Sequence, residues 1–256
     1  MVGIIFFLFG FIMLIAAFVL EGGALGALAG LTPAMIVFGG VIGATGLTMP
    51  AATLKAAISA LPTAFKGKKN DPVELINYFS ELSSKARKSG LLSLDSETNN
   101  EQLDQFIRLG LTQVVDGVHN EELRRTLETE VDVMTERHSA RAKVFEAAGG
   151  YAPTMGIIGT VMGLVHVLGN LSEPDKLGPL IAAAFLATLY GIASANLIFL
   201  PLGGRLKALD EQEVFRKSLI IEGIMSLQHG DSPAILKRKL GTFLETKQKV
   251  KLNSEG

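Results

Sequence analysis

Apolar residues fill two long blocks of the chain, and charged residues fill the segments between and after them. From residue 1 to 52 the only ionisable side chain is Glu21. From residue 147 to 204 the only charged side chains are Glu173, Asp175 and Lys176. This separation is typical of an integral membrane protein with water-exposed segments rather than of soluble domains, so it argues against a soluble enzyme.

The apolar blocks contain four runs long enough to cross a bilayer. Crossing the hydrocarbon core takes about 20 apolar residues at roughly 1.5 Å per residue of helix. The four runs cover residues 2–20, 31–50, 151–171 and 177–202. We expect the first run to stay as a span rather than to be removed as a signal peptide. It has no basic n-region, and no clear small-x-small cleavage site precedes Glu21.

Basic residues predict the orientation of these spans. Of the 24 Lys and Arg residues, 13 lie in residues 51–150 and 10 lie after residue 202, which leaves Lys176 alone in an outward loop. Cytoplasmic segments carry the excess of Lys and Arg. Both charged segments, and therefore both termini, are expected in the cytoplasm, and the short loops 21–30 and 172–176 are expected to face outward.

Apolar residues recur at helical spacing in the charged segments as well. They predict helices at about 70–90, 101–116, 120–145, 206–227 and 231–244. Asn70-Asp71-Pro72 is typical of a helix start, and Gly149-Gly150 is expected to separate the 120–145 helix from the third span. No strand pattern of useful length occurs. The sequence thus predicts an all-α membrane protein with spans in 1–50 and 151–202 and cytoplasmic helical parts in 51–150 and 203–256.

Composition and motifs exclude several kinds of chemistry. Without cysteine the chain has no disulfide, no Cys-ligated zinc, no iron–sulfur cluster and no thiol catalysis. The net charge of −1 gives no reason to expect nucleic acid binding. Phosphate-binding loops, metalloprotease motifs and nucleophile elbows do not occur, so we expect no enzyme, no bound metal and no direct use of ATP.

Polar side chains inside the spans point to packing or to an ion pathway. Thr160 shares a helix face with Gly156, Gly163 and Val167, and Thr188 shares one with Ala184, Gly191 and Ala195. The two hydroxyls either bond to their own helix and aid packing, or line a pathway. An ion pathway normally needs a carboxylate at membrane depth, and the four spans contain none. If ions cross here, another subunit must supply the carboxylate.

Three segments carry a resemblance to a known family. They read GYAPTMGIIGTVMGLV at 150–165, GPLIAAAFLATLYGIASANLIFLPL at 178–202 and ARKSGLLSLD at 86–95. Together with the four spans and the long loop between the second and third, they resemble the MotA/PomA stator subunits of the flagellar motor. The resemblance implies a multi-pass protein of the bacterial inner membrane in a ring of five, with the third and fourth spans facing the pore. Inside the ring it implies two copies of a MotB/PomB-type partner, whose membrane aspartate carries the coupling ion and whose periplasmic part grips peptidoglycan.

The same resemblance implies roles for particular residues. Arg87 and Asp95 match charged positions that family members present to the rotor protein FliG; from the residues alone they are an exposed pair near a helix end. Pro153 and Pro201 match prolines at the cytoplasmic ends of the third and fourth spans. A proline removes a backbone donor and allows a hinge, although a simple helix terminus fits the local sequence equally well.

Thr160 and Thr188 match a ring of hydroxyls near the partner's aspartate. Sodium-driven relatives of the PomA type tend to have threonine at the first of these positions, and many proton-driven relatives have alanine. A hydroxyl can help to replace the hydration shell of sodium. We therefore expect sodium as the coupling ion, with the proton as the alternative.

Two other functions stay open. An ExbB/TolQ-like energiser of the cell envelope is related and ion-driven, but those subunits resemble three-span proteins. A passive membrane scaffold without ion flux is the second alternative.

Overall fold

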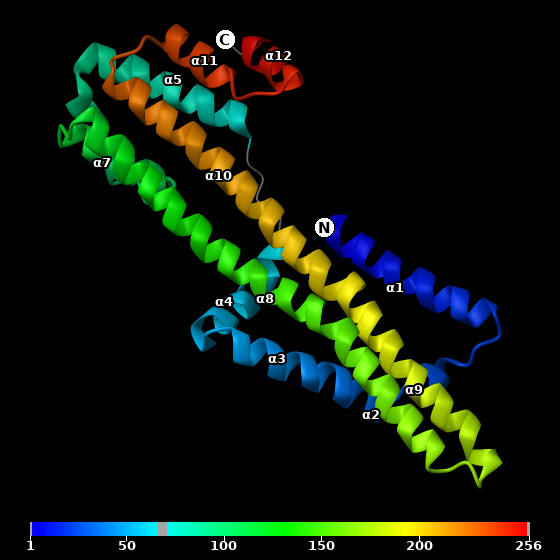
Figure 1. Cartoon of the computed structure of the whole chain (residues 1–256). Coiled ribbons are helices and arrows are strands. Elements are labelled where there is room, and N and C mark those ends of the chain that lie inside the picture. Colours follow the sequence, from blue (N-terminus) through cyan, green and yellow to red (C-terminus); the bar gives the residue numbers. More distant parts are fainter. Residues whose placement is uncertain (1, 66–70, 255–256) are drawn as a thin grey trace. The chain divides into compact units, whose positions relative to one another are not determined.

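The chain is a set of helices that fold into two compact units. The computed structural model describes residues 2–65 and 71–254, and every regular element in these ranges is helical (Figure 1). In chain order the elements are α1 (Val2–Leu20), η1 (Leu25–Leu28), α2 (Leu31–Ala34), η2 (Met35–Gly39), α3 (Gly40–Thr48), α4 (Ala51–Phe65), α5 (Pro72–Ser89), η3 (Leu91–Leu94), α6 (Asp95–Thr98), α7 (Gln105–Val115), α8 (Asn120–Leu168), α9 (Pro174–Ser194), η4 (Ala195–Phe199), α10 (Leu200–Gln228), α11 (Pro233–Gly241) and α12 (Thr246–Ser254).

Unit 1 holds the apolar part of the chain. It contains the described residues up to Phe65 together with Arg137–Leu209, and unit 2 contains the described residues from Asp71 to Glu136 together with those after Leu209. Within the described ranges, four helical stretches are long and apolar enough to cross a membrane, namely Gly3–Leu20, Leu25–Thr48, Asn120–Leu168 and Pro174–Gln228. The all-helical fold and the number of candidate spans are therefore confirmed.

The glycine pair at 149 and 150 does not end a helix, so that prediction is wrong. α8 runs without interruption from Asn120 to Leu168 and joins the predicted 120–145 helix to the third span. Gly149 is buried, and a Cβ atom on it would lie 2.6 Å from Cδ2 of Leu200. The glycine therefore allows α10 to pack closely on α8 within unit 1. This contact offsets a helix propensity cost of about 1 kcal/mol.

The predicted fourth span and the predicted 206–227 helix also form one continuous helix. α9 passes through the π-helical turn η4 directly into α10, which continues to Gln228. Pro153 lies inside α8 and Pro201 is the second residue of α10, so neither proline marks a helix terminus. Each lacks the N–H that would bond the carbonyl four residues earlier, which leaves a weak point in a continuous helix. Their use as hinges stays a prediction.

Unit 2 has an apolar core of its own. Its largest fully buried side chains include Phe79, Leu111, Leu127, Ile224 and Leu240. These residues come from α5, α7, α8, α10 and α11, so segments far apart in the sequence share one core. That burial accounts for the predicted apolar faces of the charged segments.

Two aspartates determine where helices of unit 2 begin. Asp71 accepts a hydrogen bond from the N–H of Val73 at 3.0 Å, which confirms a helix start at the predicted position; Asn70 lies outside the described residues. Asp104 accepts one from the N–H of Phe106 at 2.8 Å. The second predicted helix therefore starts at Gln105 and not at residue 101, because the capping side chain stands at 104.

Asp104 also pairs with Arg216 of α10. Burial acts to raise the pKa of this carboxyl, but the Phe106 N–H and the Arg216 guanidinium outweigh it and hold the pKa below its ordinary value. The cap of α7 is thus also a link to α10. The last helix, α12, was not among the predicted elements, because its apolar positions are too few to give a clear period.

Candidate ion pathway and charged tip

Thr160 and Thr188 lie side by side on α8 and α9 of unit 1. Their hydroxyl groups are hydrogen-bonded to each other. Thr160 Oγ1 is 3.1 Å from the carbonyl oxygen of Gly156 and 3.0 Å from that of Ala184. Thr188 Oγ1 is 3.5 Å from the same Gly156 oxygen. Two residues predicted on separate helical stripes thus form one cluster of four oxygens, which we call the threonine cluster.

The threonine cluster can support two kinds of chemistry. Its two hydroxyl protons have carbonyl acceptors within the pair of helices, as is usual for threonine in a span. Hydroxyl and carbonyl oxygens can also replace the water around a bare cation. Both threonines are half-buried, whereas Gly156 and Ala184 are buried, so the exposed part of the cluster belongs to the threonines. Packing and ion passage are compatible with the same geometry.

Glycines bring the two helix backbones close together at this cluster. A Cβ on Gly156 would lie 2.9 Å from the carbonyl oxygen of Ala187, and a Cβ on Gly191 would lie 2.5 Å from that of Ala152. Real Cβ atoms essentially never come within 3.0 Å of such atoms. α8 and α9 can therefore hold their hydroxyls in contact only because these positions carry no side chain.

Arg87 and Asp95 lie on either side of a tight turn in unit 2. Arg87 is in the last turn of α5, Asp95 is the first residue of α6, and both side chains are exposed. Gly90 between them has a φ of 80°, a conformation that favours glycine. The Ser93 hydroxyl donates to the Gly90 carbonyl at 2.6 Å. The structure therefore presents both predicted rotor-contact residues on one exposed turn, which we call the charged tip.

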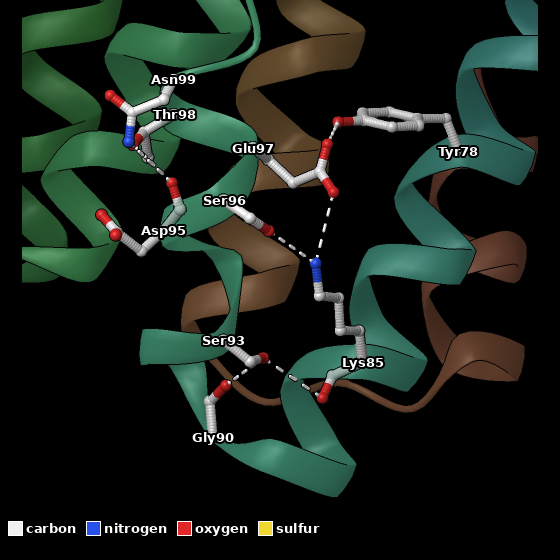
Figure 2. Close-up of polar contacts among 9 residues, drawn as sticks. All are labelled: Tyr78, Lys85, Gly90, Ser93, Asp95, Ser96, Glu97, Thr98 and Asn99. Carbon is white, nitrogen blue, oxygen red and sulfur yellow. Dashed lines mark hydrogen bonds and ion pairs between the residues drawn. The ribbon is translucent and has the colours of Figure 1, made fainter.

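A polar network supports the charged tip (Figure 2). Lys85 Nζ on α5 lies 2.9 Å from Ser96 Oγ and 3.3 Å from Glu97 Oε1 on α6. The Tyr78 hydroxyl donates to the other oxygen of Glu97 at 3.3 Å. Burial and the nearby Glu97 carboxylate raise the pKa of Tyr78, so its hydroxyl stays protonated and keeps donating. In Figure 2 the Asp95 carboxylate points away from this network, which leaves it available for another partner.

Reasoning from sequence did not identify Tyr78, Lys85 or Glu97. Tyr78 and Lys85 are seven residues apart, a helical spacing that places them on one face of α5. Glu97 lies beyond the Gly90 turn, and no helical spacing connects it to them. Only the path of the turn brings the carboxylate to its partners.

Comparisons with known proteins agree with these features. The MotA/TolQ/ExbB proton channel family matches residues 98–218, and the motility protein A N-terminal family matches residues 1–90. Motility protein A of Borreliella burgdorferi is 43% identical over 203 residues, which are 77% of this chain and 77% of that one. Chemotaxis protein PomA of Vibrio alginolyticus is 35% identical over 236 residues, 92% of this chain and 91% of that one.

The fold is also similar to that of a solved stator. The flagellar MotAB stator complex from Bacillus subtilis contains a chain with 36% identity and a TM-score of 0.90, and the match covers 98% of this chain and 97% of that one. These are families of stators and ion channels and not of enzymes. The four apolar helical stretches and the likeness to the MotAB stator together indicate a multi-pass protein of the inner membrane. The chain belongs to the MotA/PomA family of flagellar motor stator subunits.

Proposed function

We propose that this stator subunit assembles as a ring of five around two copies of a MotB/PomB-type partner, and that an ion gradient drives rotation of the ring. The observation that carries the proposal is the threonine cluster, a group of oxygens around two half-buried threonines in spans that contain no carboxylate. The likeness to a MotAB stator complex supports the choice of partner. Both termini lie in the cytoplasm, as the distribution of Lys and Arg predicts.

In this mechanism the partner supplies the carboxylate. A coupling ion neutralises the partner's aspartate, and the charge that faces the threonine cluster changes. The ring then steps relative to the partner, which is anchored to peptidoglycan. One elementary charge that crosses 100 mV releases about 2.3 kcal/mol, which is enough in principle to drive such a step. Pro153 and Pro201 serve as the hinges of the moving helices.

We propose sodium as the coupling ion. The support is that both positions of the cluster carry threonine, whose hydroxyls can replace part of the sodium hydration shell. The proton is the alternative, because proton transfer requires no such shell. No resident cofactor or metal is part of the proposal.

Swimming speed tests the function and the ion together. A motility-null strain receives this subunit with its cognate partner, and sodium is varied at fixed pH and membrane potential. We expect speed to rise with sodium and to vanish without it, and we expect Thr160→Ala to weaken this dependence. Restored swimming that is indifferent to sodium would identify the proton as the ion. Failure to restore swimming with any cognate partner would refute the stator assignment.

The charged tip is proposed to push the rotor protein FliG. Arg87 and Asp95 are exposed and oppositely charged, as contacts with a charged rotor surface require. Arg87→Glu combined with Asp95→Arg is expected to abolish swimming while the complex still assembles. Intact swimming of that double variant would remove the torque contact from the proposal.

The related envelope energiser and the passive scaffold are separated from the stator by deletion of the partner gene. The match of residues 1–90 to a motility protein family favours the stator. Loss of swimming with flagella still present is the expected result. Envelope defects would support an ExbB/TolQ-like role, and no phenotype would support a scaffold.

A further inference from the structure

Tyr190 joins α9 to the loop between the first two spans. Its hydroxyl donates to the carbonyl of Leu28 at 2.5 Å and accepts from the N–H of Gly30 at 2.9 Å. The backbone at Ala29 and Gly30 is extended, so these groups lack the partners that a helix would supply. One hydroxyl thus satisfies a donor and an acceptor at the point where the loop meets the second span.

The same end of the loop also contacts α9 one turn earlier. A Cβ on Gly30 would lie 2.6 Å from Cδ2 of Leu186, so the backbone approaches α9 closely there. Leu186 and Tyr190 are four residues apart and share a helix face. Thr188 lies midway between them, about 200° around the helix from each, and contacts Thr160 on the opposite side. α9 is therefore held between the start of the second span and α8.

We propose that Tyr190 is a positioning residue for the threonine cluster. Its two hydrogen bonds, which we call the brace, hold α9 on the side opposite α8. They keep Thr188 within hydrogen-bonding distance of Thr160 while the coupling ion binds and leaves. This inference rests on the proposed function of the cluster. The brace itself can be measured without that function.

Hydrogen exchange tests the brace directly. Tyr190→Phe keeps the ring, which lies 6.2 Å from that of Phe38 between centroids, and removes only the hydroxyl. In the subunit–partner complex in lipid nanodiscs, we expect the Gly30 amide to exchange about two- to tenfold faster, as suits the loss of one net hydrogen bond. The matched control is Tyr151→Phe, which removes a tyrosine hydroxyl from α8 and should leave Gly30 unchanged. Equal exchange in the Tyr190 variant and the wild type overturns the brace.

Ion dependence tests the positioning role. We expect Tyr190→Phe to shift the ion concentration for half-maximal speed by at least about twofold, on the same hydrogen-bond scale. A general loss of folded subunit would lower the number of working stators without moving that concentration. Faster exchange at Gly30 with an unmoved ion dependence overturns the positioning role. If the wild-type subunit fails to restore swimming, the proposed function falls with the positioning role, while the exchange result still decides the brace.

Discussion

A methyl group placed between α8 and α9 should disrupt the threonine cluster. In Gly191→Ala the new Cβ would start 2.5 Å from the carbonyl oxygen of Ala152 and 3.0 Å from Cα of Gly156, and both are backbone atoms that cannot rotate away. Ordinary contact begins at 3.4 Å, so the helices must separate by about 0.9 Å at this point. Overpacking of this kind costs typically about 1–3 kcal/mol.

The separation also predicts which hydrogen bond is lost. Thr160 Oγ1 now lies 3.0 Å from the carbonyl oxygen of Ala184 on the facing helix. If the helices move apart as rigid bodies, that distance becomes about 3.9 Å, which is beyond hydrogen-bonding range. The Thr160 hydroxyl keeps the Gly156 carbonyl of its own helix and a lengthened contact with the Thr188 hydroxyl. We therefore expect a loss of ion coupling as well as a loss of stability.

Thermal unfolding of the purified complex and swimming speed together check this prediction. The matched control is Gly178→Ala, also on α9, where a Cβ would meet nothing within 4 Å. The control should be neutral, or more stable by up to about 1 kcal/mol through helix propensity. A Gly191→Ala complex as stable and as motile as the control would show that the close approach of the backbones is not required.

Three further predictions concern unit 2. The pKa of Asp104 is lowered in the folded chain, so ionised Asp104 stabilises the fold. This stabilisation is complete above the unfolded-state pKa of about 3.9 and is lost as the pH falls through the folded-state pKa. The free energy of unfolding in urea should therefore be lower at pH 3 than at pH 5, and this difference should be smaller in Asp104→Asn. Gly90→Ala forces a side chain into a φ of 80° and should cost about 1 kcal/mol in the same assay, with swimming reduced because the charged tip is distorted. Ser83→Ala removes a fully buried hydroxyl that donates to the Asp231 carbonyl at 2.7 Å, and should lower the free energy of unfolding by about 1–3 kcal/mol; an unchanged urea midpoint would show that this contact contributes nothing.

Hydrophobic periodicity predicted the helices well, because amphipathic faces and apolar runs follow directly from burial in a core or a bilayer. It failed where a local signal depended on contacts distant in sequence. Gly149 looks like a helix end when read locally, but its partner is Leu200, some fifty residues later. Glycine fits at this position because α10 packs closely against α8 there. A pair of glycines therefore does not predict a helix end until the helix that packs against it is known.

The candidate sites show the same limit. The stripes that carry Thr160 and Thr188 were visible in the sequence, but their meeting depends on how α8 and α9 pair. Tyr190 gave no signal, because its two partners are backbone groups about 160 residues earlier. Arg87 and Asp95 were found through the family resemblance and not through their own chemistry.

The π turn η4 changes which residues of the following helix face α8. A Cβ on Gly203 would lie 3.0 Å from Cγ of Glu146, so Gly203 faces α8 as Gly191 does. In an uninterrupted α-helix, twelve residues would turn these glycines about 120° apart, but the extra residue in the π turn reduces the difference to about 20°. Removal of one residue from 195–199 would convert the π turn into regular α-helix, and the eleven residues that then separate the two glycines would leave them at the same angle of about 20°. The contact of Gly203 with α8 can therefore survive the loss of the extra residue, because the π turn absorbs it without changing the face that α10 presents.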